Sequence, residues 1–485
     1  MSVIDLGIIA AYVVGCTLLG AWLGAGEKGL KGYFLGECDI PAWALMISIV
    51  ATETSTATFL SVPGVAYQND FTYLQLAIGY LFGRVIVATI LLPAYFRGRI
   101  DTAYQLLETR FGGTTRTMAS ILFLISRSLS DGLRLFLAAK VLQQMTGWPI
   151  GVSIVAMGVA TIVYTYLGGM KAVIWTDVIQ FVIYIVGALA ALAILSQKLP
   201  GGLHELIETG RKANKFHMFD FSFDLTKTYT FWAGLIGGMV LNTATHGVDQ
   251  LMVQRYLSAR SQRQAAWALV SSGVVVFAQF ALFLFIGVGL FVFYQDFPTT
   301  GPELQPDEVF ANFIVTSLPV GVVGLVIAAI FSAAMSTLSS SLNSSASAAI
   351  NDLYRPFTGD TNEVRLLRLS KILTAVWGVV QMAVAFGATR LKDSVVNNAL
   401  AIASFVTGIL LGLFLLGIFT RRVGQNNAFA GMAAGIAMIS YVKHMEFVAW
   451  PWYALIGSST VFGIGLLTSL IAPSKTMEKV IPDNV

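Results

Sequence analysis

Charged side chains are scarce in this sequence of 485 residues. Lys, Arg, Asp and Glu together make up 12% of it, whereas 56% of the residues are hydrophobic. Soluble domains carry about 25% charged residues, and a chain this apolar could not cover a water-facing surface with polar groups. The composition therefore excludes a water-soluble enzyme and indicates a protein whose solvent is lipid.

Cysteine and histidine are rare as well. The two cysteines, Cys16 and Cys38, lie in an apolar run and in a short loop, and the four histidines are scattered. These residues do not form a disulfide framework or a zinc-type ligand pattern. Since no nucleophile–base motif and no basic run are visible either, we expect neither enzymatic activity nor nucleic-acid binding. Nothing in the sequence indicates an obligate protein partner.

Apolar runs of spanning length recur throughout the chain. A bilayer core of about 30 Å takes about 20 residues of helix, and lipid admits only helices or closed barrels. The runs are much longer than barrel strands of roughly ten residues, so we predict an all-α integral membrane protein. The 13 predicted spans are approximately 3–23, 41–64, 71–95, 115–146, 150–170, 175–197, 231–250, 265–294, 318–350, 366–387, 393–419, 427–443 and 451–472.

The distribution of Lys and Arg predicts the orientation. With the N-terminus outside, the loops that face the cytoplasm hold most of the basic residues, Arg255 among them, as the positive-inside rule requires. The first apolar run carries Asp5 and no basic segment, so we interpret it as a retained span rather than a signal peptide. We expect a multi-pass protein of the plasma membrane, the inner membrane of a bacterium, with a cytoplasmic C-terminus.

The second predicted span is unusually polar, although polar groups at mid-membrane depth are costly and often functional. Between Thr52 and Ser61 it holds six Ser or Thr residues and Glu53, and Pro63 follows. This mixture weakens a regular helix, and a broken helix exposes carbonyl groups that can bind a cation. The alternative is a continuous helix that hydroxyl groups merely bend by bonding carbonyls one turn earlier.

A stripe of polar side chains follows one helical face of residues 331–352. Its members recur at steps of three and four, and hydroxyl oxygens suit hard cations rather than zinc or copper. The alternative is a close helix interface built from small residues. The stripe consists of Ser332, Ser336, Ser339, Ser340, Asn343 and Ser347.

Two further segments place charges inside predicted spans. Gly168 and Gly169 mark a turn, after which Asp177 either faces the hydroxyl stripe or interacts with the dipole at the start of its own helix. Arg127, Asp131 and Arg134 share one face of another span. They form internal ion pairs, or an arginine remains available for a substrate carboxylate.

Three motifs in this order resemble the sodium:solute symporter family. They are GGMKA with WTDVIQ shortly after it, HGVDQLMVQRYLSAR, and SSSLNSSAS with NDLYRP. The resemblance covers about residues 1–475 and implies the leucine-transporter-type fold, with two inverted repeats of five helices at about 41–197 and 231–419. Residues 1–40 precede them, 198–230 form an external loop, and 420–485 hold two further helices and a short tail.

The resemblance also implies function and site residues. It implies sodium-coupled symport of a small polar solute by alternating access, with Na⁺ as the coupling ion and the bilayer as the surroundings. The sodium ligands would be carbonyl groups of Ala51, Thr54 and Ala333 and hydroxyl groups of Ser336 and Thr337. A second sodium site would use Asp177, Ser336, Ser339 and Ser340. The substrate would contact Arg127, Ser55, Thr56, Thr58, Gln75, Asn242 and Asn398.

The predicted substrate pocket departs from that of the galactose branch. Glu53 and Thr58 stand where that branch has an Asn and a Gln facing the sugar, and Thr245 stands at the position of its inner-gate tyrosine. Arg127 matches the carboxylate-binding position of the sialic-acid branch, which favours a carboxylate-bearing or acidic-sugar solute. The alternatives are proton coupling through Glu53 or Asp177, and a sensor that binds solute without transporting it.

Overall fold

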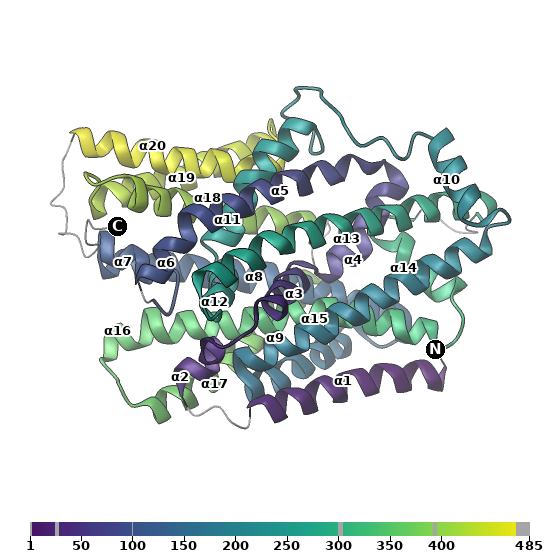
Figure 1. The fold of residues 1–485 in the computed structure, drawn as a ribbon, viewed down its shortest axis with the longest axis horizontal. Helices are drawn as coiled ribbons and strands as arrows, with labels where there is room; N and C mark the ends of the chain where they lie inside the picture. Colours follow the sequence, from purple (N-terminus) through teal and green to yellow (C-terminus); the bar gives the residue numbers. More distant parts are fainter. Residues whose placement is uncertain (1, 25–28, 99, 299–303, 391–394, 472–485) are drawn as a thin grey trace.

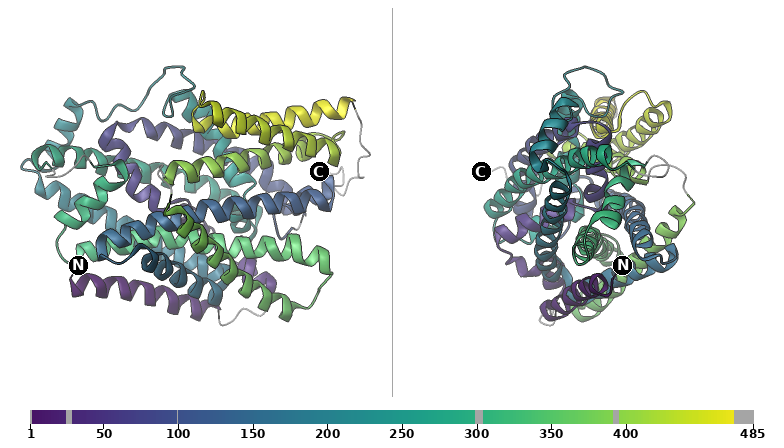
Figure 2. Two further views of the ribbon diagram at one scale, coloured as in Figure 1. Left: turned by 180° about the vertical axis from the view of Figure 1, so that it is seen from behind. Right: turned by 90° about the vertical axis from the view of Figure 1, so that its right-hand side faces the viewer.

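The computed structural model describes residues 2–24, 29–98, 100–298, 304–390 and 395–471. Throughout these ranges the regular structure is helical, and the long helices run roughly along the long axis of the molecule (Figure 1). Seen nearly along their axes, they form one closely packed bundle (Figure 2). Among the described residues, eight helices are long and apolar enough to cross a membrane, and α3 with α4 makes a ninth.

The segments predicted as spans are helical over most of their lengths. Up to the external loop, these are α1 (Val3–Gly24), α3 (Ala42–Glu53), α4 (Thr56–Gln68), α5 (Leu74–Ile86), α6 (Leu92–Gly98), α8 (Gly113–Thr146) and α9 (Ile150–Lys198). After it follow α11 (Met239–Gly247), α13 (Gln262–Asp296), α15 (Val322–Ala348), α17 (Glu363–Ala388), α18 (Val395–Phe419), α19 (Gln425–Met445) and α20 (Tyr453–Ile471).

Among the described residues, six short α-helices lie outside the predicted spans. They are α2 (Leu30–Leu35), α7 (Gln105–Phe111), α10 (Gly202–Lys212), α12 (Gln250–Leu257), α14 (Pro306–Ser317) and α16 (Arg355–Thr358). The most consequential is α12, which packs beside α3 inside the bundle (Figure 1).

Glycine breaks α9 into the two spans that the sequence predicts. An unbroken helix of 49 residues would be about 74 Å long, more than twice a bilayer core. Gly169 adopts φ +59° and ψ −161°, and a Cβ atom there would lie 2.7 Å from the carbonyl oxygen of Tyr33. Only glycine fits this conformation without strain, which confirms the predicted turn at Gly168 and Gly169.

Two other helices are interrupted in mid-course. The axes of α3 and α4 differ by 65° across Thr54 and Ser55, which confirms the predicted break in the second span. The chain likewise leaves α11 at Val248 and starts α12 after Asp249, a break that the sequence analysis did not predict. At both interruptions the regular pattern of backbone hydrogen bonds within a helix stops, and helix ends of this kind are suited to bind ions or solutes.

The most buried long helix, α15, packs against α1, α3, α8 and α9. Its first turn is anchored to α1, because Asp5 Oδ1 accepts hydrogen bonds from the backbone N–H groups of Gly321 (2.8 Å) and Gly324 (2.9 Å). A carboxylate at a helix N-terminus satisfies unpaired donors and complements the helix dipole. The helix with the hydroxyl stripe is therefore fixed at its start by the first helix of the chain.

Candidate functional site

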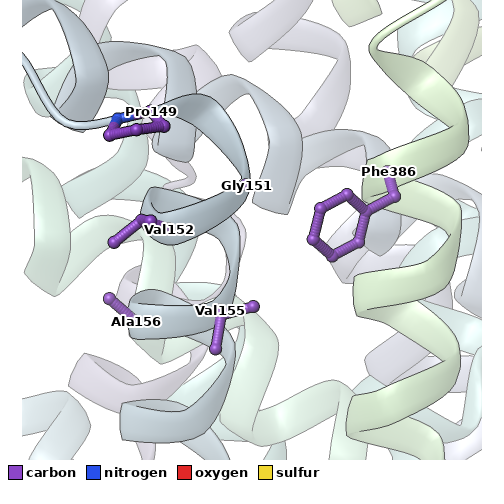
Figure 3. Close-up of a pocket in the computed structure, with 6 residues that line it drawn as sticks. All are labelled: Pro149, Gly151, Val152, Val155, Ala156 and Phe386. Atoms are coloured by element: carbon purple, nitrogen blue, oxygen red, sulfur yellow. The ribbon is translucent and has the colours of Figure 1, made fainter.

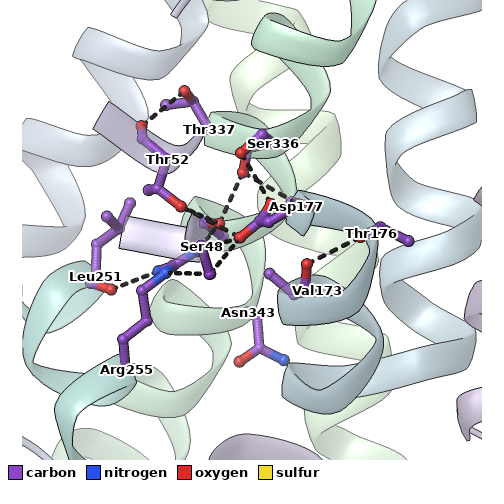
Figure 4. A network of polar contacts seen from close by, with 12 residues as sticks. Ser48, Thr52, Val173, Thr176, Asp177, Leu251, Arg255, Ser336, Thr337 and Asn343 are labelled. Atoms are coloured by element: carbon purple, nitrogen blue, oxygen red, sulfur yellow. Dashed lines mark hydrogen bonds and ion pairs between the residues drawn. The ribbon is translucent and has the colours of Figure 1, made fainter. Parts of the chain in front are cut away.

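The buried carboxylate of Asp177 in α9 connects this helix to α3 and α15 (Figure 4). Ser48 Oγ of α3 donates to Asp177 Oδ2 at 2.6 Å, and Ser336 Oγ of α15 donates to Oδ1 at 2.8 Å. Thr52 Oγ1 of α3 lies 3.3 Å from Oδ2 and from Ser340 Oγ. Asp177 is fully buried and faces the hydroxyl stripe, one of the two arrangements that the sequence allowed.

The same carboxylate is paired with a cation supplied by the chain. Arg255 Nη2 of α12 lies 3.1 Å from Asp177 Oδ2 and also donates to Ser340 Oγ. Its Nε donates to Ser48 Oγ at 3.0 Å, and its Nη1 to the Leu251 carbonyl at 2.8 Å. The assignment of Arg255 to a cytoplasmic loop is wrong, since the side chain is fully buried in the bundle. The polar sequence of α12 resembles a loop, but its charges are satisfied internally.

The residues of the first predicted sodium site lie where α3 ends against α15. Thr337 Oγ1 donates to the Thr52 carbonyl at 3.0 Å and lies 3.4 Å from the Ala333 carbonyl. Ala51 and Ala333 are fully buried, and Thr54 is buried at the break that follows α3. Carbonyl and hydroxyl oxygens in a dry interior form an environment that favours a hard monovalent cation.

A buried amide that the sequence analysis missed holds this break. Gln279 Nε2 of α13 donates to Thr54 Oγ1 at 2.7 Å, and Tyr184 OH donates to Gln279 Oε1 at 2.9 Å. The only local signal was one amide in an otherwise apolar run, which did not indicate what it would contact. These hydrogen bonds connect α9 and α13 to Thr54, the residue between α3 and α4.

The hydroxyl stripe also serves as a helix interface. Ser339 and Ser340 donate to the Ser336 carbonyl at 3.2 and 2.7 Å, and all members of the stripe are fully buried. Asn343 Oδ1 accepts from Gln254 Nε2 of α12 at 2.7 Å. The close helix interface, one of the two arrangements that the sequence allowed, is therefore present, and cation binding by the stripe stays a prediction.

The predicted substrate residues divide into free and engaged groups. Thr56 Oγ1 and Asn242 Oδ1 are buried and have no hydrogen-bond partner among the described residues. Thr58 Oγ1 accepts from the Ser55 backbone N–H at 3.4 Å at the start of α4. Gln75 is occupied elsewhere, since its side chain bonds the Thr72 and Tyr229 carbonyls and the Asp220 N–H. The side chain of Asn398 is not among those that the structure describes.

Arg127 is buried in an ion-pair cluster. Its Nε donates to Asp249 Oδ2 at 3.1 Å, its Nη2 bonds the same oxygen, and its Nη1 lies 3.6 Å from Asp131 Oδ1. Arg134 Nη1 lies 2.6 Å from Asp131 Oδ1. The predicted internal ion pairs are confirmed, and Asp249 is a partner that the sequence analysis did not identify because it lies 122 residues away.

A second ionic cluster adjoins the break in α3 and α4. Glu53 pairs with Arg84 of α5, and His246 Nε2 of α11 lies 3.5 Å from Glu53 Oε2. Arg84 also donates to Ser272, and His246 Nδ1 lies 2.9 Å from Tyr256 OH. This cluster connects five helices of the bundle, α3, α5, α11, α12 and α13. Its cationic partner explains how the Glu53 carboxylate is tolerated inside the molecule.

The hollow shown in Figure 3 is not a site for a polar solute. It lies between the start of α9 and the end of α17, and its lining is apolar: Pro149, Gly151, Val152, Val155, Ala156 and Phe386. Within the described ranges, no group of three or more His, Cys, Asp or Glu residues could hold a metal ion. The polar centre around Asp177 and the two broken helices is therefore the candidate site.

A helical bundle with interrupted helices around a buried polar centre defines a membrane transporter of the leucine-transporter-type fold. The model of the sodium:solute symporter family matches residues 33–435, and the chain belongs to that family. It is a sodium-coupled secondary transporter that crosses the membrane several times, and it is not an enzyme. Na⁺ is its coupling ion.

Relatives and solved structures agree with this assignment. The sodium/sialic acid symporter of Proteus mirabilis is 30% identical over 98% of this chain and 96% of its own. The human sodium/iodide cotransporter is 30% identical over 90% of this chain and 69% of its own. The substrate-bound, outward-open structure of a Na⁺-coupled sialic acid symporter matches with a TM-score of 0.90 at 29% identity, covering 98% of this chain and all of the other.

A more distant structure shows the same fold. A nucleobase-cation-symport transporter in a closed conformation matches with a TM-score of 0.59 at 13% identity, over 90% of this chain and 93% of its own. The fold class predicted from the sequence is confirmed.

Proposed function

We propose that this transporter carries an acidic sugar of the sialic acid type together with sodium. The observation that supports this best is the buried guanidinium of Arg127, which already binds a carboxylate in the bundle interior. A relative named for sialic acid matches almost the full length of both chains, as does a solved sialic acid symporter. Relatives named for iodide and monocarboxylates have similar identity, so the uptake assay below compares these three solutes.

We propose two sodium positions. The first uses the Ala51, Thr54 and Ala333 carbonyls and the Ser336 and Thr337 hydroxyls. The second uses Asp177, Ser336, Ser339 and Ser340. Thr337 already bridges α15 and the end of α3, so an ion there would hold both helices together. Sodium entry would stabilise the broken span and complete the substrate site, which is a coupling of two binding free energies.

The substrate would lie beside the two broken helices. Thr56 and Asn242 each present a buried oxygen without a partner, and a bound polar solute would satisfy both. Ser55, Thr58, Gln75 and Asn398 complete the proposed set. Gln75 would contribute only after release from its external-loop partners.

The membrane arrangement is also a proposal. The repeats would comprise 41–197 and 231–419, and the protein would lie in a bacterial inner membrane with its N-terminus outside. Reporter fusions that are active on only one side of the membrane, placed at both termini, would test this. Two termini on the same side would contradict it.

Uptake into proteoliposomes tests the function. Labelled sialic acid, iodide and a monocarboxylate would be offered with an inward sodium gradient, and separately with an inward proton gradient in choline. We expect accumulation of sialic acid that requires sodium and increases with a negative interior potential, which adds about 2.3 kcal/mol per charge per 100 mV. Accumulation driven by protons alone, or saturable binding without uptake, would refute it.

A further inference from the structure

The short helix α12 carries an ion pair at each end, and the two pairs lie in different sites. Asp249 immediately precedes α12 and binds Arg127, the proposed carboxylate-binding residue. Arg255 lies in its last turn and binds Asp177, the carboxylate of the proposed second sodium site. The helix α12 together with its N-cap residue Asp249 therefore contacts both sites with charges of opposite sign.

Asp249 holds Arg127 as a substrate carboxylate would. Its Oδ2 accepts from Nε at 3.1 Å and from Nη2, so it occupies the edge of the guanidinium that binds carboxylates in a forked geometry. Its Oδ1 accepts from the Leu251 N–H at 3.0 Å and caps α12. A substrate carboxylate can bind this edge only if Asp249 leaves it.

Arg255 fills the opposite role at Asp177. Its guanidinium bonds Asp177, Ser340 and Ser48. Two of these, Asp177 and Ser340, belong to the proposed second sodium site. A sodium ion bound to the same oxygens would compete with this tethered cation.

We propose that α12 carries internal substitutes for both ligands and couples their binding. In the ligand-free protein, Asp249 stands in for the substrate carboxylate and Arg255 for the second sodium ion. Each arriving ligand takes the place of one of these side chains and loosens one end of the helix. The second ligand then meets a helix that is already half released, so each ligand strengthens the binding of the other. This inference builds on the proposed function.

The balance of buried charges favours this exchange. Arg127 and Arg134 are balanced by Asp131 and Asp249, so a substrate carboxylate added without displacement would leave an uncompensated buried charge. An ion placed beside Asp177 while Arg255 remains would create a surplus of positive charge. Replacement of one charge by another of the same sign avoids both costs at Arg127 and at Asp177, and it requires that the released Asp249 and Arg255 side chains reach water or pair with each other.

The sodium part of the proposal is tested without substrate. The thermal midpoint of the purified full chain would be titrated with NaCl against choline chloride at constant ionic strength. We expect Arg255→Gln to lower the half-saturating sodium concentration about tenfold, within the usual range of coupling effects. Arg255→Lys keeps the positive charge but loses the forked geometry of the guanidinium, so we expect a smaller decrease in the half-saturating sodium concentration. This variant replaces Arg255→Gln in the test if Arg255→Gln does not fold.

Arg116→Lys is the matched control. This buried arginine pairs with Asp352 at 2.7 Å and also bonds Glu108 and the Asn351 carbonyl, none of which belongs to the proposed sodium sites, so we expect the sodium affinity of wild type. Sodium affinity that is unchanged in a folded Arg255→Lys or Arg255→Gln variant would overturn the competition at Asp177.

The substrate part uses sialic acid binding with and without sodium. Asp249→Asn removes the charge but preserves the helix cap, because Asn and Asp cap equally well. We expect about tenfold tighter binding without sodium, and a smaller gain on adding sodium than in wild type. Asp131→Asn removes a charge beside the same arginine without touching α12, and should keep the wild-type sodium effect.

The two proposals fail in different ways. If Asp249→Asn binds sialic acid no more tightly and sodium strengthens binding as in wild type, the exchange at Arg127 is wrong. If wild-type protein never binds sialic acid, the proposed substrate is wrong, and the sodium titration still decides whether Arg255 competes with the ion.

Discussion

Replacement of Thr337 by Val should weaken sodium binding strongly while leaving the fold intact. Val has nearly the same shape but lacks the hydroxyl, which donates to the Thr52 carbonyl at 3.0 Å in a site that is 3% exposed. Loss of this bond alone costs about 1 kcal/mol of stability. Loss of one oxygen ligand to a cation should cost about 1.5–3 kcal/mol, if it resembles a hydrogen bond to a charged group. That corresponds to about 10- to 150-fold in sodium affinity.

The assay is sodium-dependent uptake at fixed substrate, with the half-saturating sodium concentration as the measured quantity. Thr337→Ser is the matched control, because it keeps the oxygen and removes only a methyl group. We expect its sodium dependence to stay within about threefold of wild type, the effect of a small packing change. Equal sodium dependence of the Val variant and wild type would show that this hydroxyl does not bind the ion.

Three further predictions concern stability, each read from the thermal midpoint of the purified protein. Glu53→Gln should lower the free energy of unfolding by about 3–5 kcal/mol, because it leaves Arg84 as a buried unpaired charge. The double variant with Arg84→Gln should recover most of this loss, and an equal loss of stability in both variants would contradict the ion-pair explanation. Gly169→Ala should prevent normal folding, since φ is +59° and the new Cβ would lie 2.7 Å from the Tyr33 carbonyl, and a wild-type midpoint would refute this. Lys215→Met should lower the free energy of unfolding by about 1–3 kcal/mol, because it removes the ammonium group that donates to the Gln68 and Asn69 carbonyls at the end of α4; an unchanged midpoint would show that water replaces the ammonium.

Local sequence carried enough information for the helices and for the breaks that depend on composition. Long apolar runs predict spans because lipid demands internal backbone bonding. The dense hydroxyl groups after Thr52 predict a break in the second span, which the structure places at Thr54 and Ser55, and Gly168 and Gly169 predict the turn within α9. Spacing alone placed Ser336 on the polar face of α15, where the structure also finds it.

The missing part of the site depends on contacts between distant segments. Arg255 and Asp249 lie in a polar stretch that resembles a loop. No pattern within that stretch indicates that Arg255 pairs with Asp177 or that Asp249 pairs with Arg127. Gln279 is one amide in an apolar helix, and only the packing of α13 against α3 gives it Thr54 as a partner. Ion pairs between distant segments are set by tertiary packing, which single-sequence periodicity does not encode.

The bond between Asp5 and the start of α15 has a practical consequence for protein engineering. The carboxylate of Asp5 accepts hydrogen bonds from the backbone N–H groups of Gly321 and Gly324. A Cβ atom added at Gly324 would lie 2.7 Å from the Asp5 Cα, so the two chain segments are in direct contact. A tag or deletion that moves the first turn of α1 would uncap a helix more than 300 residues downstream. Fusion partners for purification or imaging are therefore better attached at the C-terminal end. An N-terminal deletion should remove no residue beyond Met1, because Ser2 bonds the Asp5 carboxylate.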